Sequence, residues 1–203
     1  DGRGCVDSNR RALHPWVTNP DVSNADILWA LVESGEEAGS LSAELESLKT
    51  AAEKSDNSYV LALAANVFAK TGQKEAAQQL MDRLAKQQDS DGHVAGSTQT
   101  IVGSRGQAQV IETTSLAALA WLSDEDYIDF TDKAIRFLAA ACKAGRFGST
   151  QSTVLALRAI VAHDKAMAHP KSPGTLELLV DGKRVGEPVA FDKQCVRIWL
   201  DES

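Results

Sequence analysis

The chain has 203 residues and a mass of 21.7 kDa, the size of one large domain. Twenty-eight acidic residues against twenty-one basic ones give a net charge of −7, which argues against nucleic-acid or anionic-membrane binding. No apolar run approaches the roughly 18 residues of a membrane span, and the first five residues do not resemble a signal peptide. The three cysteines, Cys5, Cys142 and Cys195, are odd in number and far apart, so no disulfide framework is expected.

Alanine divides the sequence into two parts, because 29 of the 30 alanines precede Pro170. Alanine-rich sequence with leucine at three- and four-residue spacing is typical of helices. The pattern predicts seven helices, at about 22–35, 40–54, 58–71, 73–88, 109–123, 125–143 and 150–165.

A proline- and glycine-containing linker begins at Pro170, and the pattern after it changes to that of strands. Leu176, Leu178 and Val180 alternate along one segment, Asp181-Gly182 is typical of a hairpin turn, and Val189 and Phe191 follow. We therefore expect a helical domain over 1–169, and a linker with β-strands, the start of another domain, over 170–203.

The helices are of two kinds that alternate along the chain. Residues 27–31, 60–64, 115–122 and 154–160 are apolar nearly all round, as buried helices are, whereas the helices between them have a charged face. The apolar helices recur at intervals of 33, 55 and 39 residues, and glycine turns precede three of them. This predicts a mostly α protein built as a partial α/α toroid; a helical-repeat solenoid is the alternative.

Two segments resemble the thioester domain of the alpha-2-macroglobulin and complement family. Residues 145–153 are similar to the family's Gly-Gly-aromatic-Gly-Ser-Thr-Gln-x-Thr stretch, and residues 111–117 to its Val-Glu-x-Thr-x-Tyr-x-Leu helix. Asn24–Leu31 and Ser58–Leu63 fall where the family has two further inner helices, and the likeness is greatest to bacterial members. The residues that carry the motif are Glu112, Thr113, Thr114, Gly145, Phe147, Gly148, Ser149, Thr150, Gln151 and Thr153.

The resemblance implies an α/α toroid followed by a flanking β-sandwich, within a protein that traps or inhibits proteases or serves surface defence. It also implies an extracytoplasmic location: periplasmic, cell-surface or secreted. The family's reactive thioester lies in a Cys-x-Glu-Gln motif, which none of the three cysteines begins. We expect that motif upstream or absent, so no catalytic, cofactor or metal residue is assigned.

Other chemistry is weakly supported. Asp89-Ser90-Asp91-Gly92 resembles the opening of a calcium loop, but the twelfth position is Thr100, so a turn is favoured. Cys142 lies in an alanine-rich stretch and is expected to be a buried packing residue. Glu112 is expected to face the interior as a hydrogen-bond acceptor, with an acid or base role as the alternative.

The alternatives to a protease-trapping module are a toroid enzyme of the lyase or cyclase type and a plain helical interaction scaffold. The enzymes need aspartate-rich, zinc-binding or Tyr/Arg/His sets that cannot be assembled from this sequence.

Two further expectations concern packing. Phe147 should be buried, and Gly148 should require a positive φ or a close backbone approach. Apolar residues of the 22–35 helix and of the tail should lack partners, so the chain is expected to self-associate. These residues are Ile27, Leu28, Trp29, Leu31, Leu176, Leu178, Val189, Phe191 and Trp199.

Overall fold

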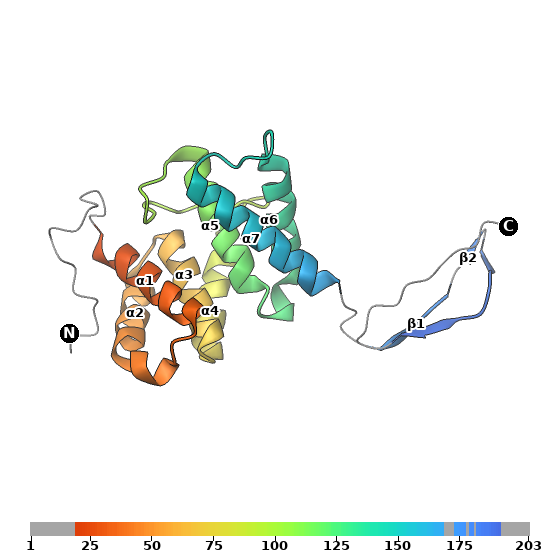
Figure 1. The fold of residues 1–203 in the computed structure, drawn as a ribbon, viewed down its shortest axis with the longest axis horizontal. Coiled ribbons are helices and arrows are strands. Elements are labelled where there is room, and N and C mark those ends of the chain that lie inside the picture. Colours follow the sequence, from red (N-terminus) through yellow and green to blue (C-terminus); the bar gives the residue numbers. More distant parts are fainter. Residues whose placement is uncertain (1–18, 169–172, 178, 181, 192–203) are drawn as a thin grey trace. The chain divides into compact units, whose positions relative to one another are not determined.

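A computed structural model describes residues 19–168, 173–177, 179–180 and 182–191. Its helices are α1 (Pro20–Ser34), α2 (Ser42–Lys54), α3 (Ser58–Lys70), α4 (Lys74–Ala85), α5 (Gly106–Trp121), α6 (Ile128–Ala141) and α7 (Thr150–Met167), shown in Figure 1. Short 3-10 turns, Ala38–Leu41 and Glu125–Tyr127, precede α2 and α6. Two compact units are distinguished, Asp1–Val161 and Ala162–Ser203. Among the described residues, no helix is long and apolar enough to cross a membrane.

All seven predicted helices are present, and their ends differ from the predicted ones by a few residues. Asparagines cap two of them: the side chain of Asn19 accepts from the backbone N–H of Asp21, and that of Asn57 from Tyr59. Gly35 ends α1 in the left-handed conformation, with φ of +97°. The largest differences are of three residues: α5 begins at Gly106 rather than near 109, α6 begins at Ile128 rather than near 125, and α4 ends at Ala85 rather than near 88.

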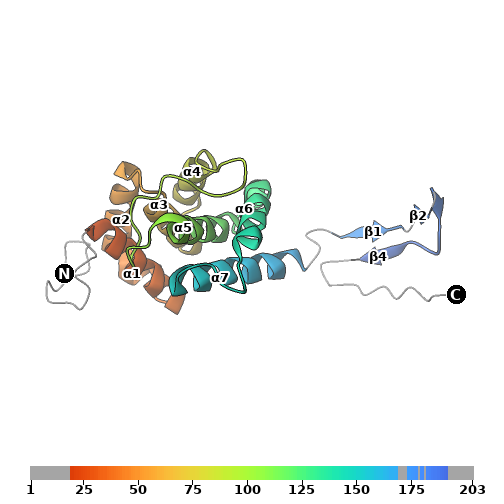
Figure 2. The same cartoon turned by 90° about the horizontal axis from the view of Figure 1, so that it is seen from above.

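Helices that are buried on nearly all sides alternate with helices that bury only one face. In α3 and α5 ten residues each are buried, whereas α2, α4 and α6 bury only three or four residues each. Figure 2 shows α5 nearly end-on, with the other helices of this unit around it. The fold is therefore mostly α and has the alternating arrangement of a partial α/α toroid, followed by a short β segment.

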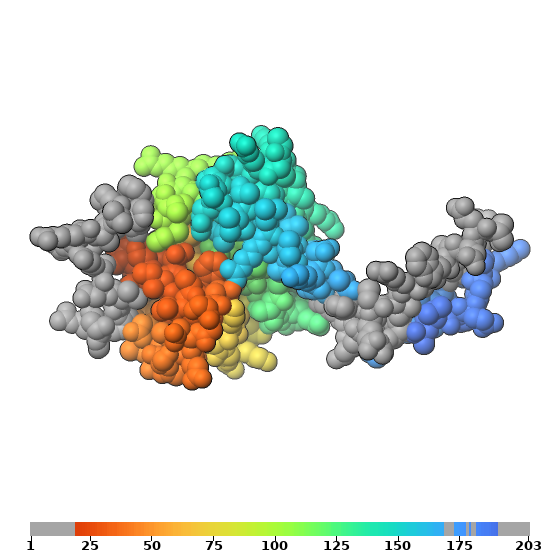
Figure 3. Space-filling model, viewed as in Figure 1, coloured from red at the N-terminus to blue at the C-terminus, as the bar shows by residue number. Residues whose placement is uncertain are grey.

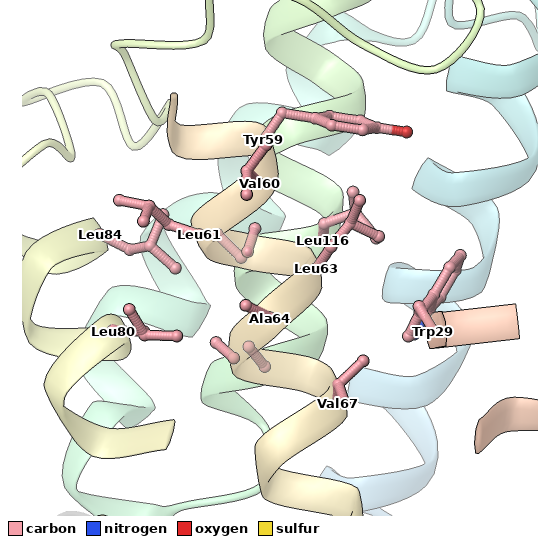
Figure 4. Close-up of a cluster of buried hydrophobic side chains, with 14 of the residues drawn as sticks. Trp29, Tyr59, Val60, Leu61, Leu63, Ala64, Val67, Leu80, Leu84 and Leu116 are labelled. Atoms are coloured by element: carbon pink, nitrogen blue, oxygen red, sulfur yellow. The ribbon is translucent and has the colours of Figure 1, made fainter. Parts of the chain in front are cut away.

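Small side chains allow the buried helices to pack closely. Ala62, Ala64 and Ala65 of α3 are fully buried. The larger Leu61 and Leu63, which alternate with them along the helix, are fully buried as well. Figure 4 shows Leu80 and Leu84 of α4 on one side of α3 and Leu116 of α5 on another. Interlocking of this kind gives the close packing that protein interiors require.

The last helix, α7, is more exposed than the sequence suggested. On α7, Leu155, Ala156 and Ala159 are buried, but Val154 is 56% exposed and Leu157 is 49% exposed. The prediction of a helix buried all round is wrong here, because one face of α7 has no neighbour among the described residues. Figure 3 shows α7 on the visible surface.

On α1 the outcome is mixed. Ile27 is 36% exposed, as expected of a residue without a partner, but Leu28 and Trp29 are 2% and 8% exposed. The expectation that Leu28 and Trp29 lack partners is therefore wrong, because both belong to the common hydrophobic core of the unit. Leu31 packs against the same core.

Cys142 corrects another expectation, since it is exposed and not buried. It immediately follows α6, whose last residue is Ala141, and its backbone is extended, with φ of −68° and ψ of 118°. The alanine-rich run that suggested burial therefore ends one residue too early to carry Cys142 into the core. Cys5 and Cys195 lie outside the described residues.

The second unit contains short antiparallel strands. β1 (Gly174–Leu176) pairs with β4 (Val189–Phe191), and β2 (Leu179–Val180) pairs with β3 (Lys183–Arg184). Gly182, in the predicted hairpin turn, has φ of +76°. Leu176 and Leu179 are 47% and 59% exposed. Leu178 and Trp199 lie outside the described residues.

Gly92 is the glycine whose replacement should cost most. A Cβ there would lie 2.2 Å from the backbone oxygen of Lys133 on α6, whereas at Gly148 the nearest atom is the Cβ of Ala108 at 3.5 Å. Gly148 has the positive φ that the sequence suggested, +96°, but no close backbone approach. The tight contact of Gly92 is formed with a helix distant in sequence.

We expect Gly92→Ala to lower the free energy of unfolding by about 3 kcal/mol or more, from left-handed strain and overpacking together. Gly35→Ala is the matched control, because Gly35 has the same φ of +97° and no atom within 4 Å of an added Cβ. That control should cost about 1 kcal/mol, from strain alone. Urea unfolding of both variants measures the difference, and equal costs would contradict the contact with Lys133.

Candidate functional site

The carboxylate of Glu112 joins three segments of the chain. Glu112 is fully buried on α5, and its Oε1 accepts hydrogen bonds from the hydroxyls of Ser104 (2.6 Å) and Ser149 (3.1 Å). Ser104 lies in the loop before α5, and Ser149 lies in the turn before α7. One carboxylate oxygen thus holds both the loop before α5 and the turn before α7 against α5.

The glycine turn before α7 is held by its own aromatic side chain and backbone. Phe147 is 3% exposed and belongs to the core. Gly145 and Gly148 have φ of +74° and +96°, values that favour glycine. The N–H groups of Lys143 and Arg146 each donate to the other's carbonyl, at 2.9 and 3.0 Å, and close the turn.

Hydroxyl groups complete the start of α7. Ser149 Oγ accepts from the backbone N–H of Ser152 at 3.0 Å, which is the bond of a helix N-cap. Ser152 Oγ is fully buried and donates to the carbonyl of Phe147 at 2.7 Å, while Thr153 Oγ1 accepts from the N–H of Phe147 at 3.3 Å. Thr150 is exposed and Gln151 is half-buried, and neither has a hydrogen-bonded side chain in this network.

The two threonines after Glu112 are fully buried. Thr113 Oγ1 donates to the carbonyl of Gln109, one turn earlier, at 3.0 Å. Thr114 Oγ1 accepts from the backbone N–H of Val94 at 2.9 Å and thereby ties the Asp-Gly-His-Val turn to α5. Glu112 and Thr114 therefore attach three segments to α5: the loop before it, the turn before α7 and the turn that contains Val94.

Sequence reasoning missed two further members of this cluster, Asp26 on α1 and Tyr59 on α3. Tyr59 is fully buried, and neither its hydroxyl nor Oε2 of Glu112 has a hydrogen-bond partner among the described residues. The signal that could have found Asp26 is a lone carboxylate inside the apolar run 25–29. The same signal had pointed to Glu112.

Burial and like charge act together on these side chains. Desolvation, with a smaller contribution from the charge of Glu112, raises the pKa of Asp26 to about 6. Desolvation also raises the pKa of Glu112, although the hydroxyls of Ser104 and Ser149 act in the opposite direction. Burial and then the charges of Asp26 and Glu112 raise the pKa of Tyr59. In all three groups burial therefore shifts the protonation equilibrium towards the neutral form.

The other candidates considered in the sequence have structural explanations. Asp91 Oδ1 accepts the backbone N–H of His93 at 3.1 Å, as expected for a turn, and its carboxylate also contacts the His93 ring. Within the described part of the chain, no group of three or more His, Cys, Asp or Glu side chains is placed to hold a metal ion.

The alternating helices, the glycine turns and the buried Glu-Thr-Thr helix define the class of protein as an α/α toroid domain. The sequence model of the family described as "A-macroglobulin TED domain" matches residues 24–163. This chain therefore belongs to the A-macroglobulin TED domain family. A search of curated proteins gave no match.

The raised pKa of Asp26 predicts that the domain loses stability as the pH rises. Because the folded state holds the proton more tightly than the unfolded chain, this contribution is complete below about pH 4. It is lost as the pH rises through the folded value of about 6. Between pH 5 and pH 8 we expect the wild type to lose about 1–2 kcal/mol more than Asp26→Asn.

Urea unfolding at the two pH values measures this difference, and comparison with the variant removes the contributions that are common to both proteins. Asp21→Asn is the control, since Asp21 is exposed on the first turn of the same helix. An Asp26→Asn variant as sensitive to pH as the wild type would contradict the interpretation.

Proposed function

We propose that this domain is a non-enzymatic module of an alpha-2-macroglobulin-like protein that traps or inhibits proteases. The observation that carries the proposal is the family match over residues 24–163. The motif side chains support it, because the hydrogen bonds of Glu112, Ser149 and Thr153 hold turns and helix ends together. In this proposal they position the toroid and take no part in catalysis.

Covalent attachment would have to come from another part of such a protein. An internal thioester needs a cysteine thiol and a glutamine side chain brought together in a Cys-x-Glu-Gln motif. Cys142 is followed by Lys143-Ala144-Gly145, so it does not begin one. We therefore propose that these 203 residues supply the scaffold of the domain and no acyl-transfer chemistry of their own.

Methylamine tests this directly, because it opens thioesters by forming an amide on the glutamine. We expect the intact mass of the protein to stay unchanged after treatment, and no free thiol to appear beyond those titrated beforehand. Incubation with serine, cysteine and metalloproteases should likewise give no complex that survives denaturing electrophoresis. A methylamine adduct on glutamine or a covalent protease complex would overturn the proposal.

The family relationship also supports two coarser features of the proposal. Alpha-2-macroglobulin-like proteins act outside the cytoplasm, so we propose a periplasmic, cell-surface or secreted location. We propose further that residues 1–169 form the toroid domain and that residues 170–203 begin a flanking β-sandwich. The antiparallel pairing of β1 with β4 is in keeping with that second assignment.

The exposed face of α7 supports the expectation of self-association. Val154, Leu157 and Val161 are each about half exposed and follow one another at helical spacing. We expect light scattering to give an average mass above 21.7 kDa that increases with concentration. Leu157→Asp should lower this mass towards that of the monomer.

Val102→Asp is the matched control, because Val102 has a similar exposure of 47% but lies in the loop before α5. It should associate as the wild type does. A wild-type protein that stays monomeric at all concentrations, or equal effects of the two substitutions, would contradict the role of α7.

A further inference from the structure

A small pocket lies where the buried helices α1, α3 and α5 end, far along these helices from the Glu112 cluster. Its volume is about 240 Å3, and its lining residues are Glu33, Asn66, Ala69, Lys70, Leu119, Ser123 and Arg158. Glu33 and Lys70 come from the last turns of α1 and α3, and Ser123 follows α5. The motif residues contribute nothing to this pocket, and the proposed function does not use it.

Arg158 is held in place at the wall of the pocket by two different contacts. Its guanidinium group donates to Glu33 Oε2 through one nitrogen. The same group stacks over the indole ring of Trp29, with 4.8 Å between the guanidinium carbon and the ring centroid. Figure 4 shows Trp29 beside the ribbon of α7. An arginine fixed in this way loses little side-chain entropy when it binds a ligand.

The two cations of the pocket can donate more hydrogen bonds than they do to the described residues. Each carboxylate oxygen of Glu33 accepts a hydrogen bond from one of the two cations, Oε2 from Arg158 and Oε1 from Lys70 at 2.8 Å. The amide nitrogen of Asn66 donates to the carbonyls of Ala62 and Leu116. Arg158 can donate five hydrogen bonds and Lys70 three, yet within the described residues each has only Glu33 as its hydrogen-bond acceptor.

The charges in the pocket decide which kind of acceptor it fits. Two cations and one carboxylate leave a net charge of +1, in a chain whose overall charge is −7. Three helix ends with partial negative charge lie near it, and they repel a dianion such as phosphate more strongly than a monoanion. Leu119 and Ala69 give part of the wall an apolar character.

We propose that this pocket binds a small monoanionic carboxylate, whose oxygens accept hydrogen bonds from Arg158 and Lys70 while a short apolar body packs on Leu119 and Ala69. The carboxylate belongs to a small acid or to the carboxyl terminus of a peptide, because both present the same group. The modest volume restricts the ligand to a molecule smaller than those that fill drug-sized pockets.

Butyrate is the probe, titrated into the isotope-labelled protein and followed by the NMR signals of the Trp29 indole N–H and the Lys70 backbone N–H. Butyramide and inorganic phosphate are titrated in parallel. We expect butyrate to bind with a Kd of about 1–10 mM, several-fold more tightly than either comparison compound, and more weakly as salt is added. N-acetyl-alanyl-valine, with a free carboxyl terminus, shows by its affinity relative to butyrate which source the pocket prefers.

Arg158→Gln should weaken butyrate binding about fivefold, since it removes one charge-assisted hydrogen-bond donor. Glu33→Gln should strengthen it about threefold, because the remaining cations are then no longer neutralised. Arg136→Gln is the control, because it removes the same charge from an exposed position on α6. Circular dichroism melts confirm that each variant is folded.

Opposite effects of the Arg158 and Glu33 substitutions distinguish ligand binding from a structural ion pair, which both substitutions would break alike. Butyramide binding as tightly as butyrate would overturn the proposal. So would weaker butyrate binding by Glu33→Gln, or equal effects of Arg136→Gln and Arg158→Gln. None of these outcomes bears on the methylamine test, so the two proposals fail or stand separately.

Discussion

The hydrogen bonds accepted by Oε1 of Glu112 hold together the parts of this domain that helix packing alone leaves loose. The helices pack through apolar side chains, but the segments between them are polar and must be fixed by other means. Ser104 and Ser149 donate to the same oxygen, so the loop before α5 and the turn before α7 are attached to one point on the central helix. Loss of that carboxylate would remove a hydrogen bond from both segments at once.

A buried carboxylate is costly unless its oxygens are satisfied, and here only one of the two is. Oε2 of Glu112 and the hydroxyl of Tyr59 have no partner among the described residues, and Asp26 adds a second carboxyl group nearby. Protonation relieves this cost, and for that reason the pKa values of both carboxyl groups are raised. The same interaction that organises the loops therefore makes stability depend on pH.

Charge is arranged differently at the other end of the buried helices. Glu33 forms ion pairs with both Lys70 and Arg158, and these three side chains connect α1, α3 and α7. Carboxyl groups without cations lie in the Glu112 cluster, whereas the pocket beside Glu33 has an excess of cations. The two ends of the buried helices thus differ in the charge of their side chains.

Much of the candidate site could be predicted from the sequence because its members are close in the chain. Gly148, Ser149 and Ser152 form a turn and a helix cap within a few residues, and such local hydrogen bonds follow from residue type and spacing. The burial of Glu112 could also be expected, since it begins an apolar stretch. Asp26 and Tyr59 were missed because only the packing of α1 against α3, and of α3 against α5, brings them to Glu112.

The sequence by itself determined the seven helices, their alternation and the glycine turns, because helix periodicity and left-handed glycines are local properties. Only the tertiary structure decided that Gly92 meets the backbone of Lys133, that Arg158 stacks on Trp29 and that Cys142 is exposed. Each of these depends on the position of a helix distant in the chain, or on the residue at which a helix ends. Residue patterns along one segment carry no record of the distance to another, so such contacts appear only when the helices are packed.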